Sequence, residues 1–147
     1  MKKIRLEKEI YGQQGRPCHI TICCQRDLVP FAKAEYASYC MSLLEGLCRD
    51  YNVQLYVYCF MPDHLHFIIS LRGRRSIIDL VGGFKSMATK GSRRFGFDGR
   101  VFQSRFFDHF IRTVEELERE ILYILNNPAR KRLVENGDDY LFRKCFL

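Results

Sequence analysis

The sequence lacks several features that mark membrane, secreted or repetitive proteins. No run of 18 apolar residues occurs in its 147 residues, so no membrane-spanning helix is expected. Residues 1–5, MKKIR, are charged and no apolar stretch follows them, so no signal peptide is expected. Internal repeats and low-complexity tracts are absent as well. With 47% hydrophobic and 28% charged residues, the composition is that of a folded chain, and its length suits one domain spanning residues 1–147.

No CxxC pair is present, although the chain has seven cysteines. A zinc ribbon or a thioredoxin-type site is therefore not expected. The odd count and the missing secretion signal argue against a disulfide framework. Five of the cysteines lie inside apolar runs: Cys23, Cys24, Cys40, Cys48 and Cys59. We therefore expect the protein to be in the cytoplasm, where its thiols stay reduced and pack as small hydrophobic side chains.

Positive charge exceeds negative charge, with 24 Lys and Arg against 17 Asp and Glu and a net charge of +7. Residues 72–100 carry most of the excess, with eight Lys or Arg against two Asp. This balance indicates a polyanionic partner, although many basic proteins bind nothing acidic.

Hydrophobic periodicity predicts four strands and three helices. The strands are residues 19–24, 53–61, 64–71 and 105–112; the helices are residues 31–51, a segment after Ser76, and a segment between Thr113 and Pro128. Ser76 with Asp79, and Thr113 with Glu116, are capping-box pairs that begin the second and third helices. Their order predicts an α+β fold, a ferredoxin-like four-stranded antiparallel sheet with helices on one face; a different antiparallel sandwich is the alternative.

Three finer expectations follow from the same patterns. Strict alternation in residues 53–61 places Val53, Leu55, Val57, Cys59 and Met61 on one face and Tyr56, Tyr58 and Phe60 on the other. Those aromatic residues either pack in the core or stack on bases. The core stripe of the second helix comprises Ile77, Leu80, Val81, Phe84 and Met87. Pro128 is expected to end the third helix.

The segment His64-Leu65-His66 places two imidazoles on one face of a strand, about 7 Å apart along it. Both rings could reach one metal ion. The other interpretation is a pair of hydrogen-bonded or solvent-facing histidines without a ligand.

The third helix carries a tyrosine away from its apolar stripe. At about 100° per residue, Tyr123 lies roughly 150° from the centre of that stripe, and Asn127 follows it at i+4 on the same face. The tyrosine either presents its hydroxyl to a substrate or simply lies on the surface.

These residues fit one chemistry. A divalent cation held by His64 and His66 would polarise a phosphate oxygen, and the Tyr123 hydroxyl could attack the phosphorus. Asn127 could complete the coordination. Candidate phosphate contacts are Lys85, Lys90, Arg93 and Arg94, with a solvated helix end as the alternative for the two arginines. Candidate supporting residues are His109, on the fourth strand, Glu120 and, with less support, His19.

Three segments resemble the single-tyrosine HUH transposases of the insertion-sequence-200-like family. Residues 61–69, MPDHLHFII, resemble the family's His–hydrophobe–His signature, and residues 102–109, FQSRFFDH, its segment leading into the last strand. Residues 123–130, YILNNPAR, resemble its Tyr-Ile-x-x-Asn-Pro block. The blocks keep the family's order over about residues 18–135, and the Asn-Pro ending is most like the REP-associated tyrosine transposases. The family usually has a tryptophan near position 102, where this chain has Phe102 and no Trp at all.

The resemblance implies a ferredoxin-like domain, with a catalytic helix beside the second sheet face, that cuts and rejoins single-stranded DNA near hairpins. Tyr123 matches the nucleophile that forms a 5′-phosphotyrosine. His64 and His66 match the ligands of Mg²⁺ or Mn²⁺, and Asn127 matches the third ligand position. The implied partner is single-stranded or hairpin DNA and not a membrane, with a monomer slightly favoured over a homodimer.

Two other functions stay open at this point. One is a catalytically inactive nucleic-acid-binding module, and the other is a metal-dependent phosphodiesterase that uses activated water in place of Tyr123.

Overall fold

A computed structural model describes residues 15–136 and 139–147 of the chain. Residues 1–5, for which the sequence predicts no signal peptide, lie outside the described residues. The described helices are α2 (Ala34–Asp50), α3 (Ile77–Ser92) and α4 (Val114–Arg130), with short 3-10 helices at Pro30–Ala32 and Arg93–Phe95. The strands are β1 (Cys18–Cys23), β2 (Val53–Met61), β3 (His64–Leu71), β4 (Phe107–Phe110) and β5 (Arg143–Cys145).

The strands form one antiparallel sheet in the order β4-β1-β3-β2-β5. The first four strands have the order of the predicted ferredoxin-like fold, which confirms the α+β class. The sheet has five strands and not four, since β5 adds to the free edge of β2 with Val57 opposite Cys145. Its three residues are too few to show a period, and the pairing edge that stabilises them belongs to a distant segment.

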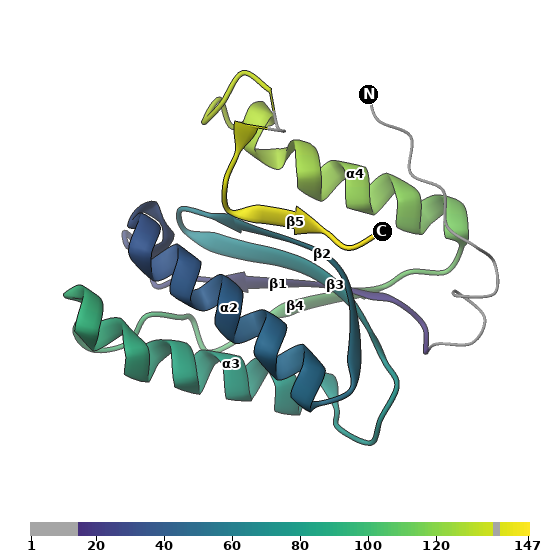
Figure 1. The fold of residues 1–147 in the computed structure, drawn as a ribbon, viewed down its shortest axis with the longest axis horizontal. Helices are drawn as coiled ribbons and strands as arrows, with labels where there is room; N and C mark the ends of the chain where they lie inside the picture. Colours follow the sequence, from purple (N-terminus) through teal and green to yellow (C-terminus); the bar gives the residue numbers. More distant parts are fainter. Residues whose placement is uncertain (1–14, 137–138) are drawn as a thin grey trace.

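Helices cover both faces of the sheet (Figure 1). α2 and α3 pack on one face, where the larger buried cluster includes Tyr36, Phe67 and Phe84. α4 packs on the other face, where Ile121 and Ile68 belong to a second buried cluster. The single α4 leaves part of its sheet face for the polar groups described below.

Strict alternation fails in β2 because of a bulge between Leu55 and Val57. Beyond the bulge the faces exchange, so that Tyr58 and Phe60 pack under α2 and α3, while Val57 faces α4. The predicted grouping of Val57, Cys59 and Met61 with Val53 and Leu55 is therefore wrong. A bulge inserts one extra residue and shifts the side-chain period by one position. Because Tyr56, Tyr58 and Phe60 are fully buried, they belong to the core and do not stack on bases.

α3 begins at the predicted capping box, in which Ser76 and Asp79 each bond the backbone of the other. Its predicted core stripe is wrong at one position, because Met87 is 46% exposed. Ala88 is buried in its place, and its carbonyl accepts a hydrogen bond from the Tyr36 hydroxyl of α2. The stripe moves by one residue because a helix turn of 3.6 residues lets either i+3 or i+4 face the core.

α4 does not end at Pro128 but continues to Arg130. The residue before the proline keeps its helical bond, since Asn127 accepts from the Lys131 amide. Two arginine side chains bond carbonyls in the turn that precedes the proline: Arg130 donates to the Tyr123 carbonyl and Arg143 to that of Leu125. One of these contacts lies within α4 and the other comes from β5, and together they offset the proline's local penalty.

All seven cysteines lie in the described residues, and none forms a disulfide. Burial raises the pKa of Cys18 to about 11 and the pKa values of Cys40, Cys48 and Cys59 to about 12. These thiols stay protonated at neutral pH, as expected for packing residues. Within the described part of the chain, no helix has the length and apolarity to cross a membrane.

Candidate active site

Two histidines project together from β3, on the sheet face that α4 covers only in part. The ring centroids of His64 and His66 lie 4.7 Å apart, with the rings nearly perpendicular. His66 is buried and His64 half-buried. The alternation of a strand brings the two rings to one side, while Leu65 between them packs in the core under α2 and α3.

Each of the two rings has a partner at Nδ1. The His64 Nδ1 lies 2.7 Å from a carboxylate oxygen of Asp63. The His66 Nδ1 lies 3.1 Å from the Nε2 of His19 and 3.0 Å from the hydroxyl of Thr21. Because Nδ1 is engaged in both rings, the Nε2 atoms are the nitrogens available to a ligand.

Burial is the main cause that lowers the pKa of His66 to about 3, and the neighbouring His64 and His19 lower it further. A neutral imidazole is the form that binds a metal ion. The ring is therefore ready to act as a ligand at neutral pH without losing a proton first.

Tyr123 of α4 approaches this pair from the helix side. Its ring centroid lies 6.3 Å from that of His66, in an edge-on arrangement, and the side chain is 51% exposed. The Arg130 guanidinium lies 3.9 Å above the tyrosine ring and also donates to the Tyr123 carbonyl at 2.8 Å. The ring is thus held in place while the residue stays accessible to a substrate.

Asn127 lies one turn after Tyr123 and is only 2% exposed. Its side-chain oxygen accepts a hydrogen bond from Arg130 at 3.0 Å. Its amide nitrogen is buried and has no partner among the described residues. The oxygen keeps a second lone pair for a cation, and the nitrogen could donate to an anionic oxygen.

The donor set fits a divalent metal ion. Two imidazoles present Nε2 atoms, and a buried amide supplies an oxygen nearby on the helix that carries the tyrosine. Imidazole nitrogens together with an oxygen ligand are a donor set found around divalent metal ions, with the remaining positions open to water and phosphate oxygens.

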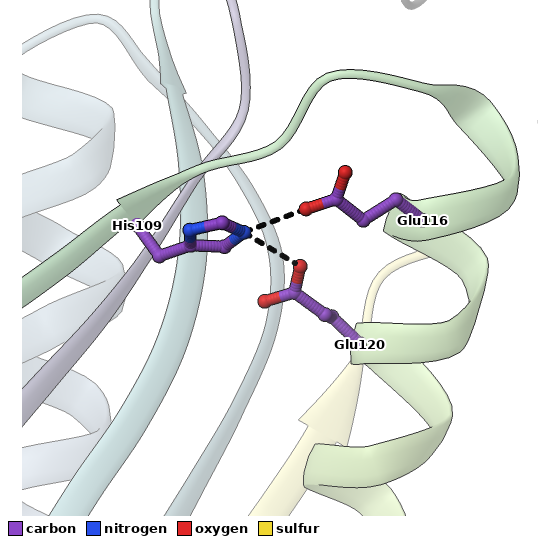
Figure 2. A group of neighbouring side chains, drawn as sticks. All are labelled: His109, Glu116 and Glu120. Atoms are coloured by element: carbon purple, nitrogen blue, oxygen red, sulfur yellow. Dashed lines mark hydrogen bonds and ion pairs between the residues drawn. The ribbon is translucent and has the colours of Figure 1, made fainter.

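The predicted supporting residues His109 and Glu120 form a cluster with Glu116 at the edge of the site. The Nε2 atom of His109 on β4 lies 2.6 Å from Glu116 and 3.5 Å from Glu120, both on α4 (Figure 2). Ligand atoms of these three residues lie within 4.8 Å of one another, so they could also hold a cation. The hydrogen bond from His109 is the main cause that lowers the pKa of Glu116.

Glu120 joins this cluster to the histidine pair. Its other oxygen lies 2.8 Å from the Nδ1 of His19 on β1, and His19 in turn contacts His66. Sequence reasoning gave His19 little weight because its position depends on the pairing of β1 with β3, which brings Thr21 opposite His66.

The predicted phosphate-binding residues differ in availability. Lys90, Arg93 and Arg94 are exposed. The ammonium group of Lys85 is engaged, since it donates to the carbonyls of Gln103 and Arg105 at 2.8 and 3.2 Å. Burial is the main cause that lowers the pKa of Lys85. Lys85 therefore anchors the loop before β4 and has little left for a phosphate.

Two cavities border this region. One of about 380 Å³ is lined by Lys85, Lys90, Arg100 and Gln103, among others. The other, of about 400 Å³, is lined by residues 23–29 together with Asp63, His64 and Gln103. Gln103 lines both cavities, so a basic surface lies next to the space that reaches His64.

Sequence reasoning missed Thr21, Asp63 and Arg130. The contact of Thr21 with His66 depends on the register between β1 and β3, so no local pattern in the sequence predicts it. Asp63 is adjacent to His64 in the chain, and Arg130 follows Asn127 at i+3, so both had a signal in their spacing.

Comparison with known proteins identifies the family of this chain. Residues 15–124 match the family model described as "Transposase IS200 like", which covers more than half of the chain, so the chain belongs to that family. The membership confirms the resemblance drawn from the three segments, and the chemistry of such transposases is DNA cleavage and rejoining.

Individual relatives agree with this placement. A curated protein of Haemophilus influenzae, named "Putative REP-associated tyrosine transposase", is 26% identical over an alignment of 117 residues, and the match covers 72% of this chain and 66% of that protein, slightly less than two thirds of its length. A solved structure of a REP-associated tyrosine transposase bound to a REP hairpin matches with a TM-score of 0.73 and 18% identity, over 97% of this chain and 82% of that one. A second structure, called a "putative transposase" from Deinococcus radiodurans, matches with a TM-score of 0.56 and 17% identity, over 86% and 97% of the two chains.

Proposed function

We propose that this protein is a metal-dependent tyrosine transposase of the REP-associated type, which cuts and rejoins single-stranded DNA beside a hairpin. The observation that carries the proposal is the approach of Tyr123 to the histidine pair, with 6.3 Å between the ring centroids of Tyr123 and His66. The tyrosine of one helix and the two imidazoles of one strand face could then contact the same phosphate.

His64, His66 and Asn127 would hold the metal ion, Mg²⁺ or Mn²⁺. When bound, the ion would polarise an oxygen of the scissile phosphate as a Lewis acid. Asp63, His19 and Thr21 keep the two imidazoles oriented through their Nδ1 atoms.

The Tyr123 hydroxyl attacks the phosphorus, and the bond between the phosphorus and the 3′ oxygen breaks. The phenolic proton is released and the departing 3′ oxygen takes up a proton, so the products are a 5′-phosphotyrosine and a free 3′-hydroxyl. Because the phosphodiester is exchanged and not hydrolysed, a 3′-hydroxyl can reverse the step and join strands.

Two features support the choice of partner. The exposed cations Lys90 and Arg100 line a cavity that meets the His64 cavity at Gln103, and this gives a phosphate backbone a basic path toward the site. A structural relative is bound to a REP hairpin, which makes hairpin DNA the first substrate to test.

One chain supplies both the histidines and the tyrosine. A monomer is therefore a sufficient catalytic unit, and we propose that the protein acts as one. Seven unpaired thiols suit action in a reducing cytoplasm.

The test is covalent adduct formation. Purified protein, Mn²⁺ and hairpin-bearing single-stranded DNA from the flanks of its own gene are incubated and separated on a denaturing protein gel. With DNA labelled at the 3′ end, the label is expected to migrate with the protein; with 5′-labelled DNA, a shorter free strand is expected. Tyr123→Phe should abolish the adduct, while Tyr51→Phe, which removes a hydroxyl from a half-buried tyrosine at the end of α2, should not.

The variants also separate the two other functions. Cleavage that survives Tyr123→Phe but is lost in His64→Ala would identify a phosphodiesterase that uses water. Hairpin binding without cleavage, unaffected by Mn²⁺ and by His64→Ala, would identify an inactive binding module. An adduct that persists in Tyr123→Phe would refute the assignment of the nucleophile.

A further inference from the structure

A chain of polar contacts runs from α4 through β1 to the histidine pair on β3. Glu120 lies 2.8 Å from the Nδ1 of His19, and the Nε2 of His19 lies 3.1 Å from the Nδ1 of His66. The side chains of His19 and Glu120 are 13% and 19% exposed, so the contact between them is shielded from most of the solvent. The three groups come from three elements that the fold brings together.

The chemistry of these groups fixes which atom donates in each of these hydrogen bonds. A carboxylate has no proton to donate, so Glu120 can only accept, and the Nδ1 of His19 must carry the hydrogen between them. A neutral imidazole has one N–H, which leaves a lone pair on the Nε2 of His19. With its one hydrogen on Nδ1, a neutral His19 cannot donate to His66.

The next contact has only one favourable arrangement. If the His66 Nδ1 also carried a lone pair, two lone pairs would face each other at 3.1 Å. The His66 Nδ1 therefore carries the hydrogen and donates it to His19. The hydroxyl of Thr21, 3.0 Å from the same atom, can accept as well and does not oppose this arrangement.

We infer that Glu120 and His19 are positioning residues that select the tautomer of His66, so that its Nε2 keeps a lone pair for a metal ion. The inference rests on the proposed function for its purpose, since a lone pair matters only if His66 binds an ion. Its structural part concerns the protein without metal and can be tested there.

The same contacts connect the two halves of the candidate site. Glu120 precedes Tyr123 by three residues on α4, so the two side chains lie on neighbouring positions of one helix face. The carboxylate that sets the His66 tautomer also holds the tyrosine-bearing helix against β1. Removal of the Glu120 carboxylate should therefore affect both metal binding and the approach of Tyr123.

The first test reads the tautomers directly in the metal-free, full-length protein, by two-dimensional NMR that correlates ring nitrogens and carbons of ¹⁵N-labelled histidines near neutral pH. The expected result is hydrogen on Nδ1 in both His19 and His66. Hydrogen on the Nε2 of His66 would overturn the inference. Because the wild-type protein is sufficient for this measurement, the test does not depend on whether any variant folds.

The second test uses Glu120→Gln, which keeps the shape of the side chain but can donate as well as accept. The glutamine no longer fixes which nitrogen of His19 carries the hydrogen, so the Nε2–H form of His66 should become populated. Affinity for Mn²⁺ alone, measured by isothermal titration calorimetry, should fall about 10–100-fold, as is typical when a group that orients a metal ligand is removed.

Glu115→Gln is the matched control, because Glu115 is exposed on the same helix, and it should leave the His66 tautomer and the Mn²⁺ affinity unchanged. Glu116→Gln removes a carboxylate that bonds His109 in the neighbouring cluster. Equal losses of Mn²⁺ affinity in Glu116→Gln and Glu120→Gln would place the ion at the His109 cluster and overturn the inference. So would a Glu120→Gln protein with wild-type tautomer and affinity.

Failure of the proposed function gives a different pattern. If the wild-type protein forms no DNA adduct while the tautomer and Mn²⁺ results are as expected, the positioning role stands and the tyrosine chemistry is refuted. If the wild type binds no Mn²⁺, the metal site is refuted, and the NMR measurement alone decides whether Glu120 and His19 fix the tautomer.

Discussion

Replacing Lys90 with methionine removes one exposed positive charge from the cavity beside α3 and keeps the length of the side chain. Lys90 and Arg100 line that cavity together with Lys85, whose ammonium group is already engaged by two carbonyls. Lys90 and Arg100 are therefore the cavity cations available to a DNA phosphate. Arg100→Met is the equivalent change at the second position.

The expected magnitude comes from counterion release. Removing one cation that pairs with a phosphate should reduce the slope of log affinity against log salt by about 0.7 for single-stranded and about 0.9 for duplex DNA. When the salt concentration rises from 50 to 200 mM, the factor by which affinity falls should be about three times smaller in each single variant than in the wild-type protein. The double variant should change the slope by about twice as much as either single one.

The assay is fluorescence anisotropy with a labelled hairpin DNA over a series of salt concentrations, without divalent metal so that cleavage does not interfere. Lys144→Met on β5 is the matched control, because it removes the same net charge from a lysine that pairs with Glu45 of α2. A wild-type slope for Lys90→Met, or an equal change for Lys144→Met, would refute the assignment of the cavity as a phosphate-binding surface.

Three further predictions concern Arg130 at the site, two glycines of α3 and the buried thiols. Arg130→Leu should slow adduct formation with little change in hairpin affinity measured by anisotropy, because the guanidinium 3.9 Å above the Tyr123 ring holds that ring in place; equal adduct rates in single-turnover assays would contradict this role. Gly82→Ala should stabilise the protein by about 0.5–1 kcal/mol, since nothing lies within 4 Å of the new methyl group and alanine favours the helix. Gly91→Ala should destabilise it by about 1–3 kcal/mol, because the new methyl group would clash with the Tyr39 ring; urea unfolding measures both, and the same sign for the two variants would be the contrary result. Above about pH 9 stability should fall, because burial raises the pKa values of the cysteines named above from 9.0 to about 11–12, so that the unfolded chain loses these protons first; thermal melts from about pH 9 upward would contradict the idea if the midpoint stayed constant to pH 11.

Local patterns in the sequence were enough to predict most of the fold. The bounds of β2 and β3 and the capped starts of α3 and α4 match those expected, because alternation and capping depend on residues that are close in the chain. At α4 only the Thr113 half of the predicted capping box forms, since the Glu116 side chain accepts from the Arg112 amide. The helical continuation through Pro128 and the strand β5 were missed, since each is stabilised by partners far along the chain.

For the candidate site, the sequence alone determined that His64 and His66 share a strand face and that Tyr123 and Asn127 share a helix face, because the periods of a strand and a helix fix these relations. Only the tertiary structure brought the helix face to the strand face. The antiparallel register of β1 and β3 places Thr21 beside His66 and lets His19 reach it, and the packing of α4 brings Glu120 to His19. Such contacts join residues about 50 to 100 positions apart, and they depend on how whole elements pack, which no local period encodes.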